Sequence, residues 1–225
     1  MNLLSQVSDE DPVATRIADL QVLRKAPPEL AGLMSVLVRL LDRNGAIVVY
    51  LTAASNGEGT STIARELAAA ATGWDWCNVA LIDASRPATA RGARIPALGV
   101  LDVAADTNDL PFHRSLCDGA TLMQAALTGP NTSLPTIETV RSVFDRIRKQ
   151  FNLTIVDGPP VLISHQISAF SAAADCVVLV VEAERTRIED LERARARLEQ
   201  LGARMLGVVL NKRRHWVPGF IHRRT

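Results

Sequence analysis

The sequence is poor in aromatic residues and carries almost no net charge. Only 4% of its 225 residues are aromatic, and Tyr50 is the single tyrosine. The 25 basic and 24 acidic residues leave a formal charge of +1, which excludes a chain drawn to nucleic acid by its overall charge. A hydrophobic share of 48% excludes wholesale disorder, and the length suits one domain with an ample core.

Cysteines and long apolar runs are also scarce. The three cysteines are an odd number without metal-ligand spacing, and Cys77 and Cys176 lie beside apolar runs, where a buried thiol is the simpler interpretation. The first basic residue is Arg16, so the charged start of a signal peptide is missing. No apolar run approaches the roughly 20 residues of a membrane helix. These features predict a soluble, cytoplasmic protein.

Apolar runs and amphipathic segments alternate along most of the chain. Strands are predicted at 46–52, 79–83, 153–157, 176–181 and 205–210, with a weaker one at 122–127. Helices are predicted at 29–43, 61–71, 137–150, 167–173 and 186–201, with a further short helix within 98–127. Such alternation predicts an α/β fold with a doubly wound, mostly parallel sheet covered on both faces. The α/β domain would span 29–211, between a flexible lead-in (1–28) and a basic-aromatic tail (212–225).

A glycine-rich loop follows the first predicted strand. Its sequence, residues 54–62, is Ala-Ser-Asn-Gly-Glu-Gly-Thr-Ser-Thr, and a helix comes next. Gly57 and Gly59 allow a tight turn whose amides face phosphate oxygens at the helix N-terminus, and Ser61 stands where a P-loop hydroxyl binds Mg²⁺. The simpler alternative is a glycine-rich turn between a strand and a helix.

This loop departs from the usual P-loop pattern G-x-x-x-x-G-K-[ST] at two positions. Ala54 replaces the first glycine, and Thr60 replaces the lysine that places a positive charge on the phosphates. A hydrogen bond to a charged group contributes about 1.5–3 kcal/mol, so the neutral threonine predicts a roughly ten- to hundredfold loss of nucleotide affinity. The loss in a phosphoryl-transfer transition state would be larger, because charge stabilisation dominates there.

Polar residues also end three later strands. Asp83 and Asp157 come directly after apolar runs, at the edge of a parallel sheet where ligands collect. One such aspartate is typical of a helix cap or a turn, but two beside a glycine-rich loop favour a bound metal ion or water. Asn211 follows the last predicted strand, where it would either bond a base edge or cap a turn.

The order of these motifs resembles the bacterial tyrosine kinases (BY-kinases). It comprises the GEG loop, LIDASRP, IVDGPPVL, VVLVVEAERTR and LGVVLNKR, and the resemblance covers about residues 29–214. BY-kinases are P-loop proteins of capsule and exopolysaccharide assembly, related to the ParA/MinD ATPases. The resemblance implies that ATP or ADP is held by Gly57, Glu58, Gly59, Thr60, Ser61, Thr62 and Asn211. It also implies that Ser61, Asp83 and Asp157 surround Mg²⁺, with Asp83 and Asp157 as catalytic residues and Asp83 activating the attacking hydroxyl.

The resemblance further implies a membrane partner. In this family the partner is a polysaccharide co-polymerase whose cytosolic segment activates the kinase. We therefore expect a peripheral location at the inner face of the cytoplasmic membrane, reached through that partner. Nucleic acid is not an expected partner, and the oligomeric state stays open.

Three departures from the family pattern bear on activity. Thr60 stands in place of the phosphate-binding lysine, as described above. The oligomerisation pattern E-x-x-R-x-x-R on the first helix is replaced by Glu29 followed by Gly32 and Ser35, and the tail from Asn211 to Thr225 holds no tyrosine. These departures predict a regulator with impaired or absent kinase activity that does not phosphorylate its own tail.

Two basic regions could carry compensating roles. Arg86 lies three residues after Asp83 and is the nearest candidate by motif position for the missing charge, with a surface or salt-bridged arginine as the alternative. In the tail, Lys212, Arg213, Arg214, Arg223 and Arg224 flank Trp216, Phe220 and Ile221. Such a segment can lie on an anionic membrane or dock on a partner, and a frayed basic terminus is the alternative.

Two other functions stay open from the sequence. One is an active P-loop ATPase or tyrosine kinase that modifies another protein, since Tyr50 lies inside a predicted strand. The other is a ParA/MinD-like positioning ATPase that uses the basic tail as its membrane contact. Ala54 and Ser55 occupy the stretch where those ATPases carry an early lysine, which disfavours this second interpretation.

Overall fold

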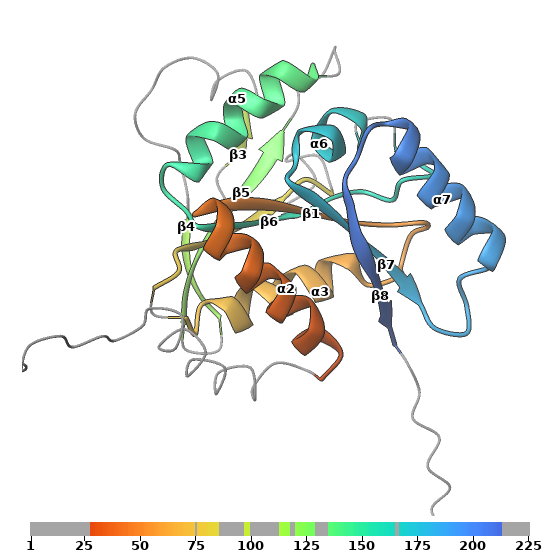
Figure 1. Ribbon diagram of the computed structural model, residues 1–225, viewed down its shortest axis with the longest axis horizontal. Coiled ribbons are helices and arrows are strands. Elements are labelled where there is room, and N and C mark those ends of the chain that lie inside the picture. Colours follow the sequence, from red (N-terminus) through yellow and green to blue (C-terminus); the bar gives the residue numbers. More distant parts are fainter. Residues whose placement is uncertain are drawn as a thin grey trace, which may run out of the picture.

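A mixed sheet of eight strands runs through the described part of the chain, and all but one of its pairings are parallel (Figure 1). The computed structural model describes residues 28–74, 76–85, 97–99, 113–117, 120–128, 135–164 and 167–212. The strands are β1 (Ile47–Ala53), β2 (Val79–Asp83), β3 (Ala97–Gly99), β4 (His113–Cys117), β5 (Ala120–Thr128), β6 (Leu153–Asp157), β7 (Cys176–Glu182) and β8 (Met205–Asn211). Their order across the sheet is β3-β5-β2-β6-β1-β7-β8, and β4 pairs with β5 antiparallel.

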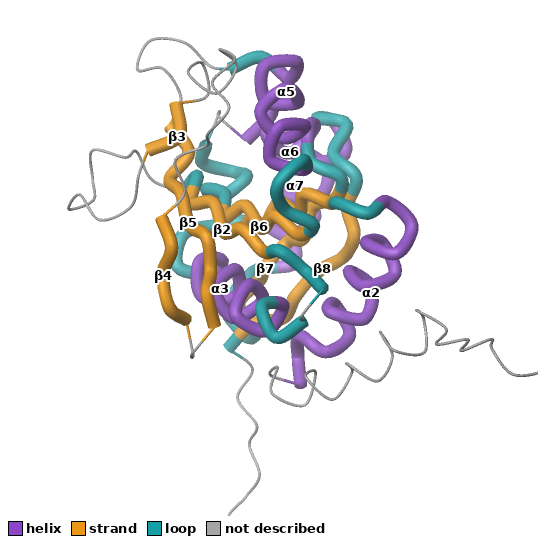
Figure 2. The backbone as a smooth tube through the Cα atoms, turned by 90° about the vertical axis from the view of Figure 1, so that its left-hand side faces the viewer, coloured by secondary structure: helices purple, strands orange, loops and turns teal. Residues whose placement is uncertain are grey.

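Helices cover the sheet on both faces, which makes three layers (Figures 1 and 2). They are α2 (Pro28–Asn44), α3 (Thr60–Ala71), α5 (Ile137–Arg148), α6 (Ile167–Ala173) and α7 (Ile188–Gln200). The buried residues of α2 and α3 share one hydrophobic cluster with Val49 and Leu51 of β1. Those of α5, α6 and α7 share the other cluster, with Val48 and Tyr50 of the same strand. The side chains of successive β1 residues therefore pack into opposite hydrophobic clusters, because side chains alternate between the two faces of a sheet.

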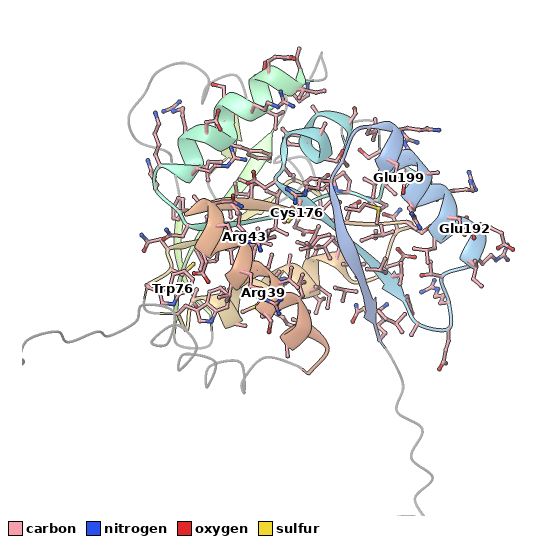
Figure 3. All side chains as sticks on the ribbon, viewed as in Figure 1. Arg39, Arg43, Trp76, Cys176, Glu192 and Glu199 are labelled. Atoms are coloured by element: carbon pink, nitrogen blue, oxygen red, sulfur yellow. The ribbon has the colours of Figure 1, made fainter. Side chains whose placement is uncertain are left out.

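Burial follows from this layering. Every residue of β1 is buried, because the strand lies inside the sheet and helices cover both its faces. Charged residues sit on the outer faces of the helices. Figure 3 shows Glu192 and Glu199 projecting from the outside of α7, whereas Cys176 lies within the molecule. Burial raises the pKa of the Cys176 thiol to about 12, which makes it an inert core residue as the sequence predicts.

The predicted doubly wound, mostly parallel α/β fold is confirmed, and the main elements lie where the periodicity places them. The weak strand predicted at 122–127 is the longer β5, next to β2 inside the sheet. The described parts of residues 98–127 are strands, and the short helix predicted within this range falls outside the described residues. The lead-in before Pro28 and the tail after Lys212 also lie outside them. Among the described helices, none combines the length and apolar character needed to cross a membrane.

Candidate functional site

The predicted site residues on the described part of the chain meet at one edge of the sheet. β1, β2, β6, β7 and β8 are parallel, so their carboxyl ends share this edge. The glycine-rich loop leaves β1 here, Asp83 and Asp157 end β2 and β6, and Asn211 ends β8. Arg86 lies outside the described residues. The edge is where a doubly wound fold binds its ligands.

The glycine-rich loop has the backbone of a tight turn into a helix. Gly57 and Gly59 have φ angles of 84° and 96°, in the left-handed region that favours glycine. Gly59 caps α3, which begins at Thr60, so the free amides of the first turn face the edge of the sheet. A side chain at Gly59 would also collide with Asn211, because an added Cβ would lie 2.1 Å from its Nδ2 atom. The backbone of the loop is therefore compatible with phosphate binding, and glycine at 59 is required.

Asp83 and Asp157 are direct register partners on β2 and β6. By alternation from Leu81 and Ile155, both carboxylates lie on the face of the sheet that α3 covers. Asp157 is 4% exposed, whereas Asp83 is half-buried and accepts hydrogen bonds from Ser85 N (3.0 Å) and Ser85 Oγ (2.8 Å). The structure thus brings the two predicted carboxylates together on the side of Ser61 and the loop.

The single tyrosine is sealed inside the core. Tyr50 is 0% exposed, and its ring stacks on Phe170 with centroids 6.4 Å apart. Burial raises the pKa of its hydroxyl above the ordinary value, and the nearby Asp157 carboxylate raises it further. Gly158 is pressed against the ring, since an added Cβ would lie 2.1 Å from its Cζ atom. A kinase cannot reach Tyr50 in the folded chain.

Glu58 turns its side chain inward. It is 5% exposed, and its Oε2 atom accepts hydrogen bonds from the amides of Ala54 (2.8 Å) and Ser55 (3.1 Å) at the start of the same loop. Its Oε1 atom accepts a 2.6 Å bond from the hydroxyl of Thr186. The Glu58 carboxylate therefore binds the protein itself, and only its backbone would contribute to a nucleotide site.

Two residues at the end of β8 hold the loop from the other side. Asn211 Nδ2 donates to the Glu58 carbonyl at 2.9 Å, and Lys212 Nζ donates to the Gly57 carbonyl at 2.7 Å. The same ammonium contacts Glu182 Oε2 at 3.0 Å. This bond holds the pKa of the Glu182 carboxyl below its ordinary value. Lys212 is thus a cation in contact with the loop, and Glu182 Oε2 pairs with Lys212 and also with Arg185, at 3.3 Å.

The residues of this edge fit Mg²⁺ better than they fit the phosphates. Two carboxylates and a hydroxyl (Asp83, Asp157 and Ser61) are hard oxygen donors of the kind Mg²⁺ binds while keeping several waters. Within the described residues, no group of three or more His, Cys, Asp or Glu side chains forms a closed metal cage. Thr60, at the first position of α3, contributes a hydroxyl where a lysine would contribute a full charge.

Sequence reasoning missed three of the residues that shape this site. Thr186 and Glu182 lie in and beside the connection between β7 and α7, and Lys212 was grouped with the tail. The sequence signal that could have found them is an acidic residue, Glu58, between the two glycines of the loop. Such a carboxylate needs donors from neighbouring segments, because burying an unpaired charge is costly.

Comparisons with known proteins show what the chain is similar to. A scan against protein-family models finds no match. The chain is 28% identical over 178 residues to the tyrosine-protein kinase CpsD of Streptococcus pneumoniae serotype 4, and the alignment covers 73% of this chain and 75% of that protein.

Solved structures share the fold. The kinase domain of the Escherichia coli tyrosine kinase ETK superposes with a TM-score of 0.65 at 20% identity, covering 84% of this chain and 76% of that one. The MinD cell division protein of Aquifex aeolicus superposes with a TM-score of 0.57 at 23% identity, covering 72% and 68%. At such identities the likeness concerns the fold alone.

Proposed function

Since the chain belongs to the BY-kinase family of P-loop proteins, we propose that it regulates capsule or exopolysaccharide polymerisation and export with impaired or absent kinase activity. It would do so in the cytosol, by docking on a membrane polysaccharide co-polymerase. The observation that carries the proposal is Thr60 at the start of α3, on a loop that otherwise keeps its phosphate-binding shape. A loop that keeps this backbone but lacks the lysine is expected in a protein that binds nucleotide weakly and transfers phosphate poorly.

The position of the tyrosine supports this function. BY-kinases phosphorylate tyrosines of their own C-terminal tails, and this tail has none. The remaining acceptor, Tyr50, is fully buried under Phe170. Within residues 1–225 there is therefore no accessible tyrosine for self-phosphorylation, which favours docking as the means by which the chain would act.

The first helix supports a departure from the family's mode of assembly. Gly32 stands where the family has the first arginine of its oligomerisation pattern, and it is exposed on α2 with open space beside it. Leu33 and Val36 of α2 line a groove there together with Val208 and Leu210 of β8. This surface lacks the two arginines of the family's oligomerisation pattern.

When bound, ATP with Mg²⁺ would supply the phosphoryl group for transfer. Asp83, Asp157 and Ser61 would hold the ion, and the loop amides from Gly57 to Ser61 would bind the phosphates. Asn211 lies beside the loop, where its Nδ2 atom donates to the Glu58 carbonyl and its Oδ1 atom accepts from the Lys212 amide, so a bond to a base edge would have to share these atoms.

A second candidate is an active tyrosine kinase that modifies another protein. The name of the relative CpsD and the paired Asp83 and Asp157 favour it. A ParA/MinD-like positioning ATPase is supported by fold alone, and Ala54 and Ser55 leave it without an early loop lysine.

The decisive experiment measures catalysis by the parent and by Thr60→Lys. Both proteins are incubated with Mg²⁺-ATP, alone and with a tyrosine-containing co-polymerase segment, and phosphate release and phosphotyrosine are quantified. We expect a parent close to background and a Thr60→Lys variant at least tenfold above it. Strong turnover by the parent would make it an active kinase or ATPase. Co-purification with a co-polymerase tests docking separately.

A further inference from the structure

A hydroxyl on the surface turn between β7 and α7 reaches the buried carboxylate of the P-loop. We infer that Thr186 is a positioning residue, which holds Glu58 and through it the P-loop in its phosphate-binding shape. The turn thereby sets the geometry of the nucleotide site. This role stands whether or not nucleotide binds.

The first step is the dependence of the loop on Glu58. The carboxylate ties the amides of Ala54 and Ser55, at the beginning of the loop, to the residue that precedes Gly59. The loop is thus closed on itself by a side chain, with no ligand taking part. A buried carboxylate needs a hydrogen-bond donor for each of its oxygens, and two amides on Oε2 leave its Oε1 atom to a third donor.

Thr186 supplies that third donor. Its Oγ1 atom donates to Glu58 Oε1 at 2.6 Å and accepts from the Glu182 amide at 2.9 Å. Its own amide donates to the Glu182 carbonyl at 3.0 Å, which closes the turn. Only a hydroxyl side chain of this size can donate and accept at once, so serine would preserve the arrangement and valine would not.

The end of β8 makes a second, parallel tie. Lys212 joins the Gly57 carbonyl to Glu182, and Asn211 joins the Glu58 carbonyl to β8. Glu182 therefore takes part on both routes, through its amide to Thr186 and through its carboxylate to Lys212. The loop is connected to the turn at two separate points, and Thr186 is the one that reaches the carboxylate.

The turn itself is accessible. The side chain of Arg185, next to Thr186, is 71% exposed, and Ile188 at the start of α7 is 72% exposed. Glu184 has a φ of 63°, a left-handed conformation that fixes the turn tightly. A rearrangement at this surface would reach the buried carboxylate through one hydroxyl.

Amide hydrogen exchange, measured residue by residue on the nucleotide-free protein, tests the inference. Thr186→Val should raise exchange at Ala54 and Ser55 about three- to tenfold, the factor expected for one lost hydrogen bond, and Thr186→Ser should restore the parent rate. The matched control is Thr136→Val, which removes the threonine cap of another helix, α5. Parent-like exchange in Thr186→Val, or an equal rise in Thr136→Val, would overturn the inference.

Glu58→Gln gives a second test that does not depend on the fold of Thr186→Val. If the two residues are coupled, perturbing Glu58 must loosen the Glu182 amide, which bonds Thr186, by a comparable factor. Unchanged exchange at Glu182 would contradict the inference.

Titration with a fluorescent ATP analogue and Mg²⁺ separates this result from the proposed function. If the parent binds, Thr186→Val should bind about three- to tenfold more weakly than Thr186→Ser, and equal binding would count against the inference. If no variant binds, the impaired site is supported and the exchange data decide.

Discussion

The central strand β1 meets a carboxylate at each end, and the two carboxylates are satisfied differently. At the amino end, Asp175 Oδ2 accepts from the Val48 amide at 2.6 Å and pairs with Arg148 at 3.0 Å. At the carboxyl end, Glu58 accepts from two amides and one hydroxyl, all of them neutral. The Asp175 carboxylate pairs with a cation, Arg148, whereas the Glu58 carboxylate has only neutral hydrogen-bond donors.

This difference separates a structural end from a functional one. The Asp175–Arg148 pair fixes the start of β1 to the segment after α6 and needs no further partner. Glu58 places a negative group within a loop whose backbone is shaped to bind another negative group. At the first position of α3, Thr60 offers that loop a neutral hydroxyl. The carboxyl end therefore holds the loop on which the proposed nucleotide site depends, and its proposed weakness is a question of charge.

The largest expected effect comes from removing Glu58. Glu58→Ala leaves the amides of Ala54 and Ser55 without their acceptor, and we expect the free energy of unfolding to fall by about 2–4 kcal/mol. Urea denaturation measures it. Glu192→Ala, on the exposed face of α7, is the control and should stay within about 0.5 kcal/mol of the parent. An equally small change for Glu58→Ala would mean that the loop does not depend on its carboxylate.

The second-largest effect is expected from restoring the missing positive charge in the loop. Thr60→Lys should tighten Mg²⁺-ATP binding about ten- to hundredfold, because a charged donor at the phosphates contributes roughly 1.5–3 kcal/mol. The rise in melting temperature with added nucleotide reports the change. Gln200→Lys adds the same charge at an exposed position at the end of α7 and should have little effect. Equal gains in both variants would point to net charge alone.

At the amino end, a double-mutant cycle isolates the ion pair. Asp175→Asn and Arg148→Met should show a coupling of about 1 kcal/mol, modest because both side chains are partly exposed. Unfolding in low and high salt measures it, and the coupling should shrink as salt screens the pair. If the effects of the two substitutions on the free energy of unfolding were strictly additive, the ion pair would not contribute to stability.

The smallest effect concerns the Lys212–Glu182 tie and its pH dependence. The bond from Lys212 lowers the pKa of Glu182 in the folded chain, so its contribution is present above the ordinary value of 4.5 and is lost as the pH falls through the lowered value. The stability difference between the parent and Lys212→Met should therefore be constant from pH 7 to about 5 and shrink below pH 4.5. Denaturation at each pH measures it. A difference that grew on acidification would contradict the assigned bond.

The sequence predicted the layers well and the details of β5 and the loop poorly. Fully apolar runs such as 176–181 must lie inside a covered sheet, so their strands were foreseeable. β5, with the sequence Ala-Thr-Leu-Met-Gln-Ala-Ala-Leu-Thr, combines residues that favour helices, and its strand depends on pairing with β2 and β3. The Asp83–Asp157 pair was foreseeable from strand ends, whereas the bond from Thr186 to Glu58 joins residues 128 positions apart.

The sequence by itself determined the fold class and two chemical deficits, because these depend on periodicity and on residue identity. No folding can turn Thr60 into a cation or add a tyrosine to the tail. Only the tertiary structure decided how Glu58 is used, that Tyr50 is sealed away, and that Lys212 lies on the loop. Each of these depends on contacts between segments that are far apart in the chain, and a local sequence pattern does not predict such contacts.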